Sequence, residues 1–221
     1  MIIKLLEWLG LAKRILLINW RWMAWNTFLA VIPLGLSYWL FRGDRPRSAL
    51  WWVVFLAFVA FLPNAPYVLT DIIHLVYDIR SEHSIWVITL VLVPQYLVFM
   101  LVGFGAYTLS LVRLGNYLIA QGMRRWVLFS ELFLHSLSAI GVYLGRFERF
   151  NSWDFVTKPH TVLDSTIDNL VAKRPVMVMT ISLLVITCLY WLMKQVTVSL
   201  MLRRRYAIEL QDQALGAQDS Q

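Results

Sequence analysis

Residues 49–78 read ALWWVVFLAFVAFLPNAPYVLTDIIHLVYD, and this stretch decides how the chain folds. As a helix, its apolar first part, 49–62, would reach only about 21 Å, short of a hydrocarbon core of about 30 Å. The chain is then interrupted at Pro63-Asn64-Ala65-Pro66 before the apolar pattern resumes at Val68. Either a broken helix completes the span, or the span ends inside protein and a surface helix follows.

The rest of the chain has the composition of a membrane protein. Of its 221 residues, 59% are hydrophobic and 15% are charged, whereas soluble domains are nearer one half and one quarter. The sequence predicts an all-α integral membrane helical bundle of about five transmembrane helices, the second of them broken. The other four spans are expected at about 24–41, 85–112, 126–145 and 176–200.

The two ends of the chain differ from this bundle, which is expected over residues 23–202. Residues 1–22 mix apolar side chains with charges, a pattern that predicts an N-terminal amphipathic helix lying on the membrane surface. Residues 203–221 form a polar C-terminal tail, which we expect to be disordered.

The excess of basic over acidic residues, and where the basic residues lie, indicate that the chain contacts lipid. The net charge is +7, but the basic residues cluster beside apolar segments, as expected for charges that face anionic head groups. We therefore predict a lipid bilayer and no nucleic acid as the environment of the chain.

A polar stripe follows the interrupted span. Tyr67, Asp71, His74 and Asp78 fall within an arc of about 40° on a helix. The stripe is either the wet side of an amphipathic surface helix or part of a site beside the prolines. Asp71 and His74 are also candidate ligands for a divalent metal, provided that a third ligand comes from elsewhere.

The fourth span carries ionisable residues of its own. Glu131 and His135 lie one turn apart inside it, and such intramembrane polar residues either form a site or are satisfied within the bundle. Farther along, Gly141 and Gly145 have the spacing of a close contact between helices.

The segment after the fourth span is rich in polar and aromatic residues. Arg146 and Arg149 suit a carboxylate or phosphate, although head-group contact would also explain them. The loop that follows lies on the same membrane face as the stripe, which favours a single polar site. Its candidates are Asn64, Tyr67, Asp71, His74, Arg146, Asn151, Trp153 and Asp154.

Motifs of well-known enzymes are missing from the sequence. It contains no hydrolase elbow, P-loop, HExxH zinc motif, CxxC pair or Rossmann glycine pattern. No catalytic residue is therefore identified, and the sequence favours a function other than that of an enzyme.

Three sets of motifs together resemble a family of bacterial multi-pass membrane proteins, domain of unknown function (DUF) 1361. They are Trp25-Asn26 through Ile32-Pro33, Leu62 to Tyr67 with Asp71 and His74, and Tyr143 to Phe147 with Asn151 to Asp154. The resemblance runs from about residue 24 to 200 and implies a bacterial inner-membrane location, without an activity to transfer. This chain departs from the family at the N-terminus, where the family has a further apolar span.

Three classes of function fit these features. The favoured one is a non-catalytic binding or assembly protein, with a polar pocket on one membrane face formed by residues 63–78 and 146–160. The second is a membrane-embedded metal-dependent enzyme or sensor, in which Asp71 and His74 bind metal and Arg146 clamps an anion. The third is a small transporter subunit, which the broken helix with Asn64 and the intramembrane Glu131 and His135 would suit, and which would act as a homo-oligomer. An assembly role would need another membrane protein as partner.

Overall fold

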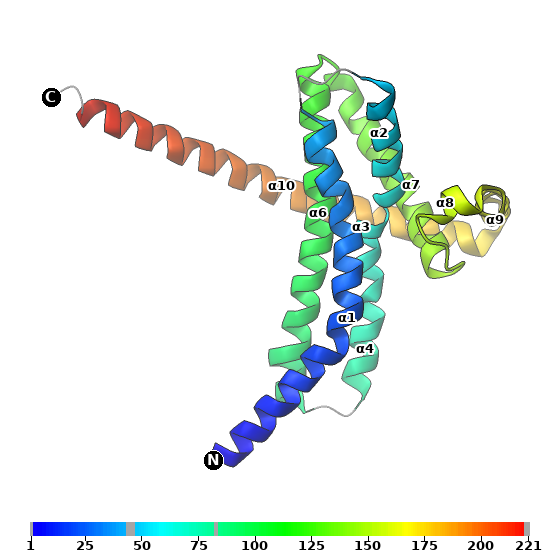
Figure 1. Cartoon of the computed structure of the whole chain (residues 1–221), viewed down its shortest axis with the longest axis vertical. Helices are drawn as coiled ribbons and strands as arrows, with labels where there is room; N and C mark the ends of the chain where they lie inside the picture. The colour runs from blue at the N-terminus through cyan, green and yellow to red at the C-terminus, as the bar shows by residue number, and fades with distance from the viewer. Residues whose placement is uncertain (1, 43–46, 82–83, 219–221) are drawn as a thin grey trace.

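The computed structural model describes residues 2–42, 47–81 and 84–218 (Figure 1). This part of the chain is built from helices and contains no strand, so the predicted all-α bundle is confirmed. Within it, five helical stretches are long and apolar enough to cross a membrane, as expected of a multi-pass membrane protein. They are Glu7–Leu40, Ala49–Arg80, Ile85–Ala120, Arg124–Arg146 and Lys173–Ile208.

The first helix, α1, runs from Ile2 to Leu40. Residues 2–22 are helical, as predicted, but they continue into the first span without a break. The N-terminal turns of α1 lean away from the other helices (Figure 1). The expected surface segment and the first span are therefore one element.

The second span is broken, as predicted. Helix α2 (Ala49–Phe61) is followed by α3 (Asn64–Tyr67), a 3₁₀ turn (Val68–Asp71) and α4 (Ile72–Arg80). Pro66 has no N–H to donate to the carbonyl of Leu62, and the Ala65 N–H donates to that carbonyl instead at 3.2 Å. The helices nevertheless follow one another down the bundle, so the span is completed by a broken helix (Figure 1).

The third span changes its helical type near a proline. It begins with α5 (Ile85–Val87) and a π-helical stretch (Ile88–Leu92), and continues as α6 (Val93–Ala120). Pro94 cannot donate to the carbonyl of Leu90, and the wider π turn directly before it accommodates the lost hydrogen bond. The helix is therefore irregular before Pro94, in the form of a π-helical turn.

The last part of the chain surrounds the end of the fourth span. Helix α7 (Val127–Arg146) leads to the short α8 (Asp154–Thr157), then to α9 (Pro159–Val171) and the long α10 (Lys173–Gln218). In Figure 1, α10 crosses the other long helices at a steep angle. Residues 203–218 continue α10, so the disorder expected for them was wrong, and 219–221 lie outside the described residues. Arg, Ala, Leu, Glu and Gln, which dominate this segment, are strong helix formers.

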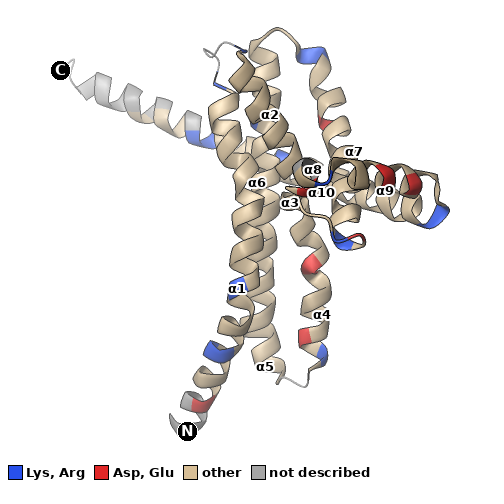
Figure 2. Cartoon of the chain, turned by 45° about the vertical axis from the view of Figure 1, so that its right-hand side comes forward, with Lys and Arg blue, Asp and Glu red and all other residues tan. Residues whose placement is uncertain are grey.

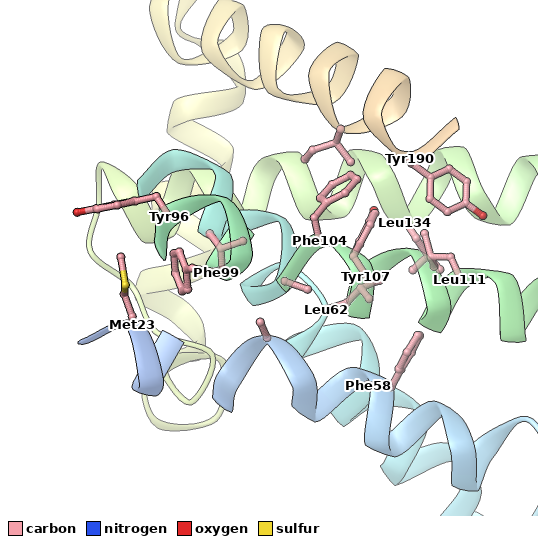
Figure 3. Packing of buried hydrophobic residues seen from close by; sticks show 14 of the residues in the cluster. Met23, Phe58, Leu62, Tyr96, Phe99, Phe104, Tyr107, Leu111, Leu134 and Tyr190 are labelled. Atoms are coloured by element: carbon pink, nitrogen blue, oxygen red, sulfur yellow. The ribbon is translucent and has the colours of Figure 1, made fainter. Parts of the chain in front are cut away.

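The core joins all the long helices. Figure 3 shows Phe58 of α2 and Leu62 directly after it, Tyr107 and Leu111 of α6, and Tyr190 of α10 converging on one packed interior. Because lipid chains are as apolar as these side chains, burial alone gives helices in a bilayer little reason to associate. Close packing and polar contacts therefore decide the arrangement.

Three glycines allow the broken helix to pack closely. A Cβ added to Gly103 of α6 would lie 2.6 Å from the Val68 side chain, and one added to Gly141 of α7 would lie 2.6 Å from Pro63. The Tyr67 ring packs over Gly145, at 3.4 Å from the position of its absent Cβ. The close contact expected at Gly141 and Gly145 is confirmed, and the broken helix is the element that uses it.

A Gly141→Ala variant is expected to be destabilised, because its Cβ would overlap Pro63 and overpacking a close contact costs about 1–3 kcal/mol. The measurement is thermal unfolding of the detergent-purified protein. Gly35→Ala is the matched control, since it adds the same methyl group in α1 where nothing lies within 4 Å. Equal unfolding temperatures for Gly141→Ala and the wild type would contradict the close contact.

Candidate functional site

The polar stripe of α4 faces α1. Asn26 Nδ2 donates to Asp71 Oδ2 at 3.2 Å, and Asn19 Nδ2 donates to Asp78 Oδ2 at 2.9 Å. Tyr96 of α6 also donates its hydroxyl hydrogen to Asp78, at 3.0 Å. Both carboxylates are thus held by side chains from other helices. For Asp71 and Asp78, the stripe is therefore not simply the water-facing side of a surface helix.

Asp71 and Arg146 form the centre of the site. The Asp71 side chain is 2% exposed, and Arg146 Nη1 lies 3.2 Å from its Oδ1. Arg146 also donates to the Thr70 carbonyl at 3.2 Å and to the Tyr67 hydroxyl at 3.4 Å. A guanidinium that donates to a buried carboxylate makes a strong charge-assisted contact. The pair joins the C-terminal end of α7 to the start of α4 and compensates the charge of both groups.

His74 lies at the edge of this centre. Its Nε2 is 3.8 Å from Asp71 Oδ1, its ring packs 5.1 Å from that of Trp22, and its side chain is 48% exposed. Within residues 2–42, 47–81 and 84–218, no group of three or more His, Cys, Asp or Glu side chains is placed to hold a metal ion. A metal on Asp71 and His74 would need further ligands, so this site stays a prediction.

A cavity of about 240 Å³ lies beside the Asp71–Arg146 pair. It opens to the surface and is lined by α1, the broken helix, the end of α7 and the turn that follows it, so the predicted segments 63–78 and 146–160 do come together. Its apolar wall includes Trp25, Leu29, Leu144 and Phe150. Its polar lining consists of Asn26, Asn64, Tyr67, Arg149, Asn151 and Ser152.

Two side chains hold the wall of this cavity in place. Asn64 Nδ2 donates to the Phe61 carbonyl at 2.9 Å and to Ser152 Oγ at 2.8 Å, which ties the broken helix to the loop. Asp154 Oδ2 accepts the Asn151 N–H at 2.6 Å and thereby shapes the loop from behind.

Arg149 has an unusual backbone in this loop. Its φ is 59°, in the left-handed region that residues other than glycine rarely adopt. Such conformations persist where the surrounding structure enforces them, and they cluster at functional sites. Here the residue with the unusual backbone is also one that lines the cavity.

The predicted site residues fall into three groups. Asn64, Tyr67 and Asn151 line the cavity, whereas Asp71, His74 and Arg146 form the charged centre beside it. Asp154 shapes the loop, and Trp153 is 45% exposed and does not line the cavity.

The candidate set lacked residues that complete the site, namely Asn19, Asn26, Arg149 and Ser152. The sequence analysis had noted Arg149 as suited to an anion, and a signal for Asn19 and Asn26 was also present in the sequence. Asn19 and Asn26 are seven residues apart, as are their partners Asp71 and Asp78, so each pair lies on one face of its helix.

The intramembrane residues Glu131 and His135 belong to a separate network. Glu131 Oε1 accepts from the Tyr190 hydroxyl at 2.6 Å and from Lys194 Nζ at 2.5 Å. His135 Nδ1 lies 2.7 Å from the Tyr107 hydroxyl. The network links α6, α7 and α10, and neither Glu131 nor His135 lines the cavity. Figure 2 shows the charged positions distributed over the helices.

Comparison with known proteins relates the chain to a family. The family described as "Protein of unknown function (DUF1361)" matches residues 25–188, a range that contains every residue lining the cavity. No curated protein and no solved structure matches the chain.

Replacing one member of the central pair is expected to destabilise the fold. Asp71→Asn or Arg146→Gln leaves the other charge without its partner, which costs about 3–5 kcal/mol for a buried pair. The double variant removes both charges and should lose less stability than the two single losses added together. Unfolding of the four proteins in detergent measures this coupling, and additive losses would show that the two side chains do not interact.

Proposed function

The chain belongs to the DUF1361 family, and we propose that it is a non-catalytic binding protein of the bacterial inner membrane whose cavity takes an oxyanion. The ligand group is a carboxylate or phosphate of a small molecule. The proposal builds on the polar pocket expected from the sequence and adds the chemistry of its ligand.

The observation that carries this proposal is a set of unused hydrogen-bond donors around one cavity. The Tyr67 hydroxyl accepts from Arg146, and the Ser152 hydroxyl accepts from Asn64, so each keeps its own hydrogen to donate. The Arg149 guanidinium and the Asn151 side-chain amide donate to no acceptor among the described residues. Carboxylate and phosphate oxygens accept several such hydrogen bonds at once, and charged donors strengthen them.

The charge around the cavity favours an anion as well. Arg149 is the one charged residue among those described that line it, and the nearby charge of Asp71 is compensated by Arg146. With Arg146 occupied in this way, Arg149 takes the role of anion clamp that the sequence suggested for Arg146. Arg149 is well suited to this role because its planar fork matches a carboxylate or phosphate.

The size and lining of the cavity favour a small ligand with a short apolar part. A volume of 240 Å³ corresponds to about eight water molecules of about 30 Å³ each. Trp25, Leu29 and Phe150 add apolar surface to the lining. Sites of this mixed kind orient a ligand by a few polar contacts and exclude water by the rest.

The chemistry of the lining supports binding more than catalysis. A serine nucleophile needs a general base beside it, and the polar neighbour of Ser152 is the Asn64 amide, which cannot take a proton. No His, Asp or Glu is among the described residues that line the cavity. The metal-dependent and transporter alternatives rest on Asp71 with His74 and on Glu131 with His135, which lie outside it.

An Arg149→Gln variant is expected to bind anions roughly tenfold or more weakly, because a charged hydrogen bond contributes about 1.5–3 kcal/mol. Calorimetric titration of the detergent-purified protein with inorganic phosphate and with acetate measures the affinity. Arg174→Gln is the matched control, since it removes the same charge from an exposed position that does not line the cavity.

Two results would contradict the proposal. One is a wild-type protein that binds neither phosphate nor acetate. The other is an Arg149→Gln variant whose affinities equal those of Arg174→Gln.

A further inference from the structure

A second and larger hollow, of about 910 Å³, lies between α1 and the third span. We call it the α1–α6 groove. Its lining is apolar except for Thr27 and Gln95. The walls include Leu16, Met23 and Phe28 on the side of α1, and Leu90, Val98 and Phe99 on the opposite side.

The groove lies between two helices that are candidate membrane spans, Glu7–Leu40 and Ile85–Ala120. An apolar hollow between spans is filled by hydrocarbon, because the surrounding solvent is lipid. Along α1 the groove runs from Leu16 to Ile32, which corresponds to a rise of about 24 Å. This length exceeds the roughly 15 Å that one leaflet contributes to the hydrocarbon core, so a whole acyl chain fits along it.

One end of the groove is basic. Lys13 lies three residues before Leu16 and seven before Trp20, so it shares the groove-facing side of α1. Arg14 is its neighbour, both side chains are exposed, and neither has an acidic partner among the described residues. Figure 2 shows basic positions on this N-terminal part of α1.

The surface at the basic end is shallow and open. A depression of about 370 Å³ is lined by Lys13 and Arg14 together with Gly10, Leu17 and Ile18. It shares no lining residue with the groove and lies at the same level of α1 as the start of the groove, since Lys13, Arg14 and Leu17 are within one turn of Leu16. Positive charge at one end of an apolar channel complements an anionic amphiphile, and basic residues beside membrane spans are suited to anionic head groups.

We propose that the α1–α6 groove binds an anionic phospholipid of the bilayer. One acyl chain lies along the groove, and the phosphate lies beside Lys13 and Arg14. This site shares none of the donors of the oxyanion cavity and does not depend on the function proposed for it.

The test compares two lipids with identical acyl chains, phosphatidylglycerol and phosphatidylcholine, by native mass spectrometry of the full-length protein in detergent. The wild type is expected to bind phosphatidylglycerol about tenfold more tightly, since each basic residue near an anionic head group adds to the attraction. A variant carrying Lys13→Gln and Arg14→Gln should lose this preference. The matched control carries Arg203→Gln and Arg204→Gln, which remove the same charge from exposed positions of α10, and should keep it.

A separate variant tests whether an acyl chain lies along the groove. Ala24 lines the groove, and Ala24→Phe should weaken both lipids to a similar extent while the preference for phosphatidylglycerol persists. Circular dichroism and size-exclusion elution confirm that each variant is folded. If Ala24→Phe does not fold, the comparison of the double variant at Lys13 and Arg14 with the control variant at Arg203 and Arg204 still decides the proposal.

Three results would overturn the site. They are equal binding of the two lipids by the wild type, a preference that survives loss of Lys13 and Arg14, and an equal loss in the control. Because Arg149 is intact in all these variants, their binding of phosphate and acetate separates this outcome from failure of the oxyanion cavity.

Discussion

The buried ion pair between Asp71 and Arg146 is the constraint on which the rest of the structure depends. A charge inside a helical bundle is tolerated only when an opposite charge and hydrogen bonds surround it. Arg146 is the last residue of α7, and Asp71 ends the turn before α4, so the pair fixes where these two elements meet. Asn26 adds α1 to the same contact. Three elements that are distant in sequence are thereby held around one point.

The broken helix can reach that point because its neighbours have no side chains in the way. Gly103 and Gly141 leave room for Val68 and Pro63, and the prolines prevent a regular helix that would place Asp71 differently. The contact of α1 with α4 then follows from polar pairing, in which Asn26 meets Asp71 and Asn19 meets Asp78. Hydrogen bonds of this kind fix the register of helices in a medium where apolar contact cannot discriminate.

The polar groups of the bundle are of two kinds, those whose hydrogen bonds are made within the bundle and those that keep donors free. In the network of Glu131, His135 and Lys194, each named group has a partner on another helix, so the network serves to hold α6, α7 and α10 together. The cavity beside Asp71 is different, because Arg149 and Asn151 line it without an acceptor among the described residues. Both side chains are exposed, and their donors are available to the oxygens of an anion. This contrast, rather than the number of polar residues, separates the cavity from the structural polar contacts of the bundle.

The sequence by itself determined the all-α membrane class, the spans, the interruption at Pro63–Pro66 and the two segments that form the cavity. These features depend on hydropathy, on proline and on helical spacing, which act over short distances along the chain. Only the tertiary structure decided that the stripe of Asp71 and Asp78 meets Asn26 and Asn19, and that Arg149 lines the cavity while Asp154 supports the loop. Polar residues recur at the same helical spacing whether their side chains face water or polar groups of another helix. The partner is chosen by the packing of helices that are far apart along the chain.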